Sequence, residues 1–242
     1  MQNKKFSAET LKYIAIIAMT IDHIAFVFVE PDSLLYFFMR LSGRLTAPIM
    51  SFFITEGFIY TKSFRKYLLR LLIFTLISQP FYFMMLFARP PENLFEFLTN
   101  LNVMFTYCIA LTALKILTEK KINSAVKAVL IGVCFAFTDL CDWSYIIPVW
   151  AIIFFLFRKA KYKNLIFIAT SLLLLIVIYL PCYDNFWDFS YQFGVILALI
   201  PLNFYNGERK KYRNEISKKF SRWIFYIYYP LHIFVLIILK NA

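Results

Sequence analysis

Asp22 and His23, two neighbouring residues in an apolar stretch near the N-terminus, are the first candidates for chemistry. Histidine titrates near neutral pH, so the His23 imidazole can take a proton from an incoming amine or hydroxyl. Adjacent residues of a helix point about 100° apart, so we expect Asp22 to pair with another helix rather than with the His23 ring. The alternative is a structural role, with His23 bonded to helix backbone.

Two arginines, Arg40 and Arg44, are spaced four residues apart and therefore share one face of a helix. Counted along the chain, they reach a depth similar to that of Asp22 and His23. One arginine can neutralise Asp22, which would leave the second guanidinium for an anionic ligand such as a phosphate. Pro48 breaks the helical hydrogen bonding to Arg44, as in helices that line a cavity. Alternatively, Arg40 extends to the outer headgroups.

The second of the two histidines, His232, lies in an apolar stretch near the C-terminus. Tyr228 and Tyr229 lie about one helical turn before it on the same face, and Pro230 loosens the helix between them. His232 is therefore a candidate substrate contact. The alternative is a structural histidine in an aromatic core.

A polar turn at 203–209 precedes a run of basic residues. Its candidate ligand-binding residues are Tyr205, Asn206, Glu208 and Arg209. The turn could bind a nucleotide, or it could simply end a helix at Gly207. Gln79 and Asn102 add polar groups in other apolar stretches that could face the same cavity.

The composition predicts that membrane helices position these residues. Hydrophobic residues make up 61% of the 242 residues and aromatic residues 20%, whereas soluble domains are about 45–50% apolar. Apolar runs of about 20 residues, the length that crosses a bilayer as a helix, recur along the chain. These runs are continuous, unlike the alternating segments of about ten residues in a β-barrel. We therefore predict an all-α, polytopic transmembrane helical bundle, folded as a single domain over residues 1–242.

About nine spans are predicted, with a range of eight to ten. They cover residues 8–29, 34–60, 65–87, 101–118, 124–139, 143–157, 164–181, 190–205 and 222–240. The fifth and sixth are short and could be re-entrant. Lys and Arg concentrate at the N-terminus and in every second connection, which places the N-terminus in the cytoplasm. The net charge of +12 lies in these short loops, so we predict a lipid bilayer and no nucleic acid as the partner.

The four cysteines, at 108, 134, 141 and 182, do not have the spacing of metal ligands, and no metal site is predicted. Cys141 and Cys182 fall near the predicted outer surface, where a disulfide is chemically allowed. Two unrelated cysteines are the simpler interpretation.

The candidate residues lie in stretches that together resemble the TraX family of bacterial membrane proteins. The matching stretches are LKYIAIIAMTIDHIAFVF at 11–28, RLSGRLTAPIMSFFITEGF at 40–58, KYLLRLLIFTLISQPFY at 66–82, NVMFTYCIALTAL at 102–114, PLNFYNGERKK at 201–211 and FYIYYPLHIFVL at 225–236. The resemblance spans nearly the whole chain. Each stretch is weak alone, and the combination is specific.

This family is named for a conjugation protein that acetylates the N-terminus of pilin, and it is similar to larger membrane acyltransferases that use cytoplasmic acetyl-CoA. The resemblance implies that His23 is the catalytic histidine, with Asp22 beside it. Arg40 and Arg44 correspond to the arginines that follow it in the family. One departure is Gln79, which together with Pro80 replaces an expected Glu-Pro pair.

The expected function is therefore a membrane-embedded acyltransferase of the bacterial plasma membrane. It would move an acetyl or other short acyl group from acyl-CoA to an amine or hydroxyl, with His23 as general base. The acceptor would be a peptide, pilin-like or glycan molecule. The residues expected to bind substrate or coenzyme A are Arg40, Arg44, Tyr205, Asn206, Glu208, Arg209 and His232. The alternatives are a multi-pass transporter or permease with a proton- or anion-linked Asp/Arg/His site, and a structural subunit of a secretion or surface-polymer complex.

Overall fold

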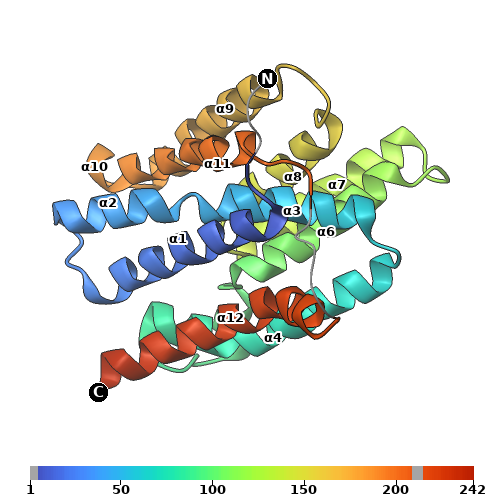
Figure 1. The fold of residues 1–242 in the computed structure, drawn as a ribbon. Helices are drawn as coiled ribbons and strands as arrows, with labels where there is room; N and C mark the ends of the chain where they lie inside the picture. Colours follow the sequence, from blue (N-terminus) through green and yellow to red (C-terminus); the bar gives the residue numbers. More distant parts are fainter. Residues whose placement is uncertain (1–4, 209–214) are drawn as a thin grey trace. The chain divides into compact units, whose positions relative to one another are not determined.

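The computed structural model describes residues 5–208 and 215–242, and for 215–222 it describes the backbone alone (Figure 1). Helices make up 79% of the structure, and the described residues contain no β-strand. The prediction of an all-α fold is therefore confirmed. The chain divides into two compact units, one formed by Met1–Met50 with Asn164–Ala242 and the other by Ser51–Lys163. That the chain acts as a single domain stays a prediction.

The first unit contains the two histidines. Its α-helices are α1 (Ala8–Phe28), α2 (Leu34–Gly43), the start of α3 (Thr46–Tyr60), α9 (Lys163–Leu174), α10 (Phe186–Ser190), α11 (Leu199–Asn203) and α12 (Glu215–Asn241). A π-helical turn at Leu175–Tyr179 and 3₁₀ helices at Leu180–Cys182 and Tyr191–Ala198 complete it. Helix α1 packs against α2 and α12, and α2 also packs against the 3₁₀ helix Tyr191–Ala198.

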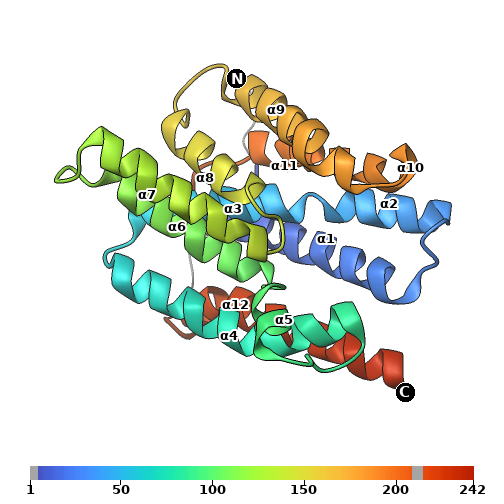
Figure 2. The ribbon, with the colours of Figure 1, turned by 180° about the vertical axis from the view of Figure 1, so that it is seen from behind.

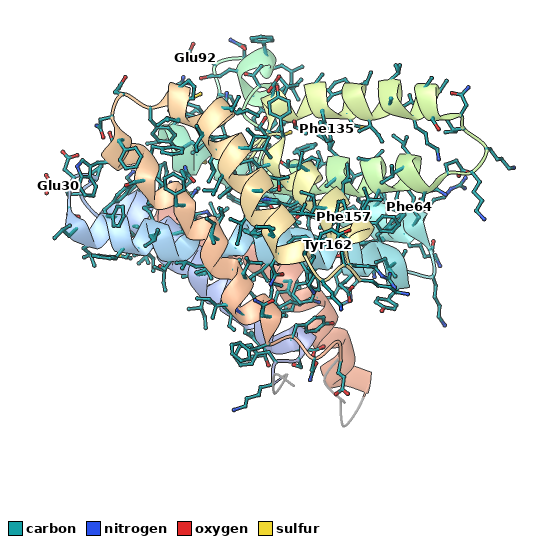
Figure 3. All side chains as sticks on the ribbon, turned by 90° about the horizontal axis from the view of Figure 1, so that it is seen from above. Glu30, Phe64, Glu92, Phe135, Phe157 and Tyr162 are labelled. Atoms are coloured by element: carbon teal, nitrogen blue, oxygen red, sulfur yellow. The ribbon has the colours of Figure 1, made fainter. Side chains whose placement is uncertain are left out.

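The second unit centres on α6. Its helices are the rest of α3, α4 (Phe64–Phe87), α5 (Leu94–Leu98), α6 (Val103–Thr118), α7 (Ser124–Phe137), the 3₁₀ turn Thr138–Leu140 and α8 (Ile146–Leu156). Helix α6 packs against α4, α7 and α8, and Figure 2 shows α6, α7 and α8 side by side. The hydroxyls of Ser51 and Thr55 on α3 donate to the carbonyls of Ile147 and Ala151 on α8, each over 3.0 Å. After α8, the rings of Phe157 and Tyr162 lie against each other in the loop (Figure 3).

Within the part of the chain that the structure describes, four helical segments are long and apolar enough to cross a membrane. They are Ala8–Phe28, Phe64–Phe87, Lys163–Cys182 and Trp223–Asn241. Two shorter apolar helices occupy Val103–Thr118 and Ile146–Leu156. Large apolar side chains such as Ile17, Leu165 and Leu173 are exposed on these helices, as expected of surfaces that contact lipid. The prediction of apolar helices long enough to span a membrane is confirmed for these four segments, whereas the count of nine spans and the orientation stay predictions.

The predicted span at 34–60 is two helices rather than one. Helix α2 ends at Gly43, and α3 begins at Thr46 after a short turn. Pro48 lies in the first turn of α3, where a helix needs no backbone N–H donor. The expected interruption of the helix near Arg44 is confirmed. The prediction of one continuous helix over 34–60 is wrong, because the helical hydrogen bonding of α2 ends at Arg44. The predicted span at 190–205 also differs, since its first half is a 3₁₀ helix.

Candidate active site

The two histidines of the chain, 209 positions apart, share a hydrogen bond. Nδ1 of His23 on α1 lies 2.7 Å from Nε2 of His232 on α12. Nδ1 of His232 lies 2.9 Å from the backbone carbonyl of Tyr228. His232 is buried, and His23 is partly buried. Nε2 of His23 has no hydrogen-bond partner among the described residues.

A second contact between the same two helices holds the histidines in place. The Tyr228 ring stacks on the His232 ring, with centroids 5.1 Å apart and planes within 8°. The Tyr228 hydroxyl lies 2.6 Å from Oγ1 of Thr20, one turn before His23 on α1. Thr20 and His23 on α1 therefore face Tyr228 and His232 on α12, in that order. The aromatic surroundings expected for a structural His232 are present, together with a bond to His23 that the sequence did not suggest.

Asp22 is the centre of a buried ion cluster beside His23. Arg40 Nη1 donates to Oδ2 of Asp22 over 2.9 Å, and Arg44 Nη2 donates to Oδ1. The expectation that Asp22 pairs with another helix is confirmed. The expectation that one arginine is left without a carboxylate is wrong, because the two oxygens of Asp22 accept one guanidinium each. Two cations against one anion leave the cluster with one net positive charge.

Aromatic rings surround the Arg40 guanidinium. Its Cζ atom lies 5.5 Å from the ring centre of Phe26, 5.6 Å from that of Tyr36 and 5.3 Å from that of Tyr191. Its side chain is only 12% exposed, so Arg40 does not extend to headgroups as the alternative interpretation proposed. Arg40 Nε is buried without a hydrogen-bond partner in the described part of the chain.

The 3₁₀ helix Tyr191–Ala198 supplies residues that the sequence reasoning missed. Gln192 Oε1 accepts from Arg44 Nη1 over 3.4 Å, and Gln192 Nε2 donates to the Tyr183 hydroxyl over 2.6 Å. Gly194 lies against the backbone carbonyl of Leu41, where a side chain would not fit. The available signal was a glutamine two positions before a glycine inside an apolar run.

The polar turn at 203–208 pairs with the segment that leads into α1. Asn206 N donates to the Phe6 carbonyl, and Ala8 N donates to the Glu208 carbonyl, both over 3.0 Å. Phe6 and Tyr205 form an isolated parallel bridge. The side-chain oxygen of Asn206 accepts from Glu208 N over 2.8 Å, so the turn uses this amide internally.

The predicted site residues therefore form two groups at opposite ends of α1. Asp22, His23, Arg40, Arg44 and His232 come together, whereas Tyr205, Asn206 and Glu208 lie beside the first turn of α1. Arg209 lies outside the described residues. The 15 residues from Ala8 to His23 correspond to about 22 Å of helix. A ligand that contacts both groups must therefore be elongated.

Gln79 and Asn102 belong to the second unit and pair with each other. Asn102 Nδ2 donates to Gln79 Oε1 over 2.8 Å, and Gln79 Nε2 donates to the Asn100 carbonyl over 2.7 Å. Asn102 also caps α6 by accepting from Met104 N over 3.0 Å. Both side chains are buried with their polar atoms satisfied, which stabilises the junction of α4 and α6.

Comparison with known proteins places the whole chain in one family. A family model described as TraX protein matches residues 7–240. The chain is also 35% identical over 244 residues to a probable fimbrial assembly protein, FimC of serogroup H1, from Dichelobacter nodosus. That match covers 97% of this chain and 96% of the FimC protein. The chain belongs to the TraX family. No solved structure matches it.

The TraX match includes every predicted site residue, from Asp22 near its start to His232 near its end. It also covers nearly all of both units, including the histidine pair and the ion cluster. Among the described residues, no group of three or more His, Cys, Asp or Glu side chains is placed to hold a metal ion. All four cysteines are free, so Cys141 and Cys182 do not form a disulfide here.

Proposed function

We propose that this TraX-family chain is a membrane-embedded acyltransferase. It moves an acetyl or other short acyl group from acyl-coenzyme A to an amine or hydroxyl of a peptide, pilin-like or glycan acceptor. One observation carries the proposal: one ring nitrogen of His23 is held by His232, and the other has no partner among the described residues. A histidine held in this way can act as a general base. A relative named as a probable fimbrial assembly protein supports a pilin-like acceptor.

In the proposed reaction, His23 takes the proton of the acceptor amine or hydroxyl. The acceptor attacks the thioester carbonyl, a new C–N or C–O bond forms, and the C–S bond breaks. The proton held by His23 passes to the leaving thiolate of coenzyme A. The net positive charge of the cluster formed by Asp22, Arg40 and Arg44 stabilises the oxyanion that forms on the carbonyl oxygen. Transfer through an acyl-histidine is a variant of the same chemistry.

The proposed donor lies along α1. Its phosphates bind near the cytoplasmic turn that contains Tyr205, Asn206 and Glu208, with Arg209 and the following basic residues supplying positive charge. The thioester then reaches His23, about 22 Å further along the helix. The elongated shape of an acyl-coenzyme A suits this separation between the two groups of residues.

The proposed topology is about nine spans in the bacterial plasma membrane, with the N-terminus in the cytoplasm. The basic residues in alternate connections support this orientation. A donor that enters from the cytoplasm would then reach a histidine on the outer side of the midplane. Such an enzyme could modify an acceptor on the far side of the membrane.

The test is acyl transfer by purified protein from labelled acetyl-CoA to candidate peptides and glycans. His23→Ala should lower the rate by about 10²–10⁴-fold, because the general base is lost. Ile17→Ala is the matched control, since Ile17 lies on α1 with its side chain exposed. A folded His23→Ala protein that keeps full activity would rule the mechanism out.

A transporter or permease is the second candidate, because hydrogen-bonded histidines beside a buried Asp/Arg cluster also suit a proton or anion pathway. Thermal stability with and without coenzyme A separates the two. A ligand that binds the folded state raises its stability, so coenzyme A should stabilise an acyltransferase. A permease for other solutes should not respond.

A further inference from the structure

We propose that His232 is a positioning residue that fixes the tautomer of His23. It holds the proton of His23 on Nδ1, so that Nε2 carries the free lone pair that accepts the substrate proton. This inference rests on the proposed function for its catalytic meaning. The hydrogen-bond assignment itself follows from geometry alone.

The assignment starts at a backbone carbonyl. The Tyr228 carbonyl can only accept a hydrogen bond, so His232 Nδ1, 2.9 Å away, must carry a proton. In neutral imidazole one nitrogen is a donor and the other an acceptor. His232 Nε2 is therefore an acceptor.

The second step follows at His23. Because His232 Nε2 accepts, His23 Nδ1 must donate across the 2.7 Å between them. The two ring planes are parallel within 1°, with centroids 4.9 Å apart. The separation of the two centroids exceeds the nitrogen–nitrogen distance by about two imidazole ring radii, so the rings lie edge to edge in nearly one plane. The hydrogen bond between them therefore lies along the direction of a nitrogen lone pair. His23 Nε2 is then the unprotonated nitrogen.

A neutral imidazole here does what a carboxylate does in a Ser-His-Asp triad, where the third residue holds the base in the correct tautomer. Asp22 is not free for this task, because both of its oxygens accept from Arg40 and Arg44. When Nε2 of His23 takes a proton, the resulting cation keeps its Nδ1–H bond to the lone pair of His232.

The Thr20–Tyr228 contact braces this arrangement. The Thr20 hydroxyl donates to the Ile16 carbonyl over 2.8 Å, so it must accept from the Tyr228 hydroxyl. The Tyr228 ring is thus held by α1 while its backbone carbonyl accepts from His232. The donor and the acceptor are therefore assigned for both side-chain hydrogen bonds between α1 and α12.

The tautomers can be read by ¹⁵N NMR of protein labelled at histidine, in detergent micelles or nanodiscs. The chain has two histidines, so two imidazoles are observed. Near-neutral spectra should show both rings as the Nδ1–H form. A His23 that carries its proton on Nε2 would overturn the inference and leave the proposed function standing. The measurement needs no substrate, so an inactive protein with both rings as Nδ1–H would reject the function alone.

Variants at 232 separate positioning from general structural damage. In His232→Gln, the side-chain oxygen can still accept from His23 Nδ1, whereas His232→Ala offers no acceptor. We expect His232→Gln to keep the Nδ1–H form and activity within about 10-fold, and His232→Ala to lose both, with activity down about 10²-fold. Equal losses of activity in the two variants would overturn the positioning role. Leu231→Ala, on the exposed side of α12, controls for disturbance of the helix.

Discussion

Gly43 of α2 packs directly against Asp22 of α1, and a methyl group on Gly43 would overlap the Cβ and carboxyl atoms of Asp22. The glycine lets α2 approach α1 closely enough for Arg40 and Arg44 to reach the carboxylate. Gly43→Ala should therefore destabilise the protein by about 1–3 kcal/mol through overpacking. Unfolding in detergent micelles measures the change.

Gly132 of α7 is the matched control for this substitution. A Cβ at Gly132 would meet no atom within 4 Å, so Gly132→Ala should stabilise the helix by roughly 0.5–1 kcal/mol. Similar changes in stability for the two variants would contradict the close approach of Gly43 to Asp22.

Asp22→Asn removes the anion from between two guanidinium groups. The buried charges of Arg40 and Arg44 would then face each other without compensation, and the expected loss of stability is about 3–5 kcal/mol. Glu30→Gln, in the exposed loop after α1, is the control and should have little effect. Adding Arg44→Gln to Asp22→Asn should recover part of the loss, since the two changes are coupled. Simple additivity of the two losses would argue against a shared cluster.

Gln79→Glu tests the amide network at the start of α6. Gln79 Nε2 donates to the carbonyl of Asn100, and a carboxylate oxygen in its place would face that carbonyl without a proton to donate. The substitution should cost about 1–3 kcal/mol at neutral pH. Asn93→Asp makes the same chemical change at the exposed cap of α5, where aspartate also serves as a cap, and should be nearly neutral. A stable Gln79→Glu protein would mean that the network is not formed as described.

The Arg89–Glu96 pair after α4 predicts a pH-dependent contribution to stability. The hydrogen bond from Arg89, with help from the Glu92 backbone N–H, lowers the pKa of the partly exposed Glu96 carboxyl. Because the folded-state pKa lies below the unfolded value, the contribution is present above the ordinary glutamate pKa and is lost as pH falls through the lowered pKa. Arg89→Gln should therefore be less stable than wild type at neutral pH and equal to it in strong acid. Lys62→Gln, at an exposed lysine outside any ion pair among the described residues, should show no such convergence.

The fold class and most helices follow from the sequence, because apolar runs of bilayer length leave few other structures open. The departures have local causes. At Gly43 and Arg44, a glycine and a nearby proline end one helix and start another within a continuous apolar run. At 191–198, tight packing of Gly194 against Leu41 accompanies a 3₁₀ helix that hydropathy cannot distinguish from an α-helix.

The candidate residues and the pairing of Asp22 with an arginine were predicted from the sequence, but the other hydrogen bonds of the site were not. The similar depth of Asp22, Arg40 and Arg44 in their predicted spans indicated that they pair, because charged side chains in an apolar span need partners. The His23–His232 bond joins the first and last helices of the chain, and sequence spacing contains no signal for such a pairing. Gln192 stood out as a polar residue in an apolar run, but its pairing with Arg44, 148 positions away, had no such signal.

The orientation and the parity of the span count can be tested with single cysteines in a background lacking the four natural ones. Lys5, Asp32 and Asn241 are exposed: the first two flank α1, and the third lies at the end of α12. With the N-terminus inside and nine spans, a membrane-impermeant maleimide should label Asp32→Cys and Asn241→Cys in intact cells. Lys5→Cys should react only after permeabilisation. Labelling of Lys5→Cys from outside would reverse the orientation, and an Asn241→Cys that behaves like Lys5→Cys would require an even number of spans, such as eight or ten.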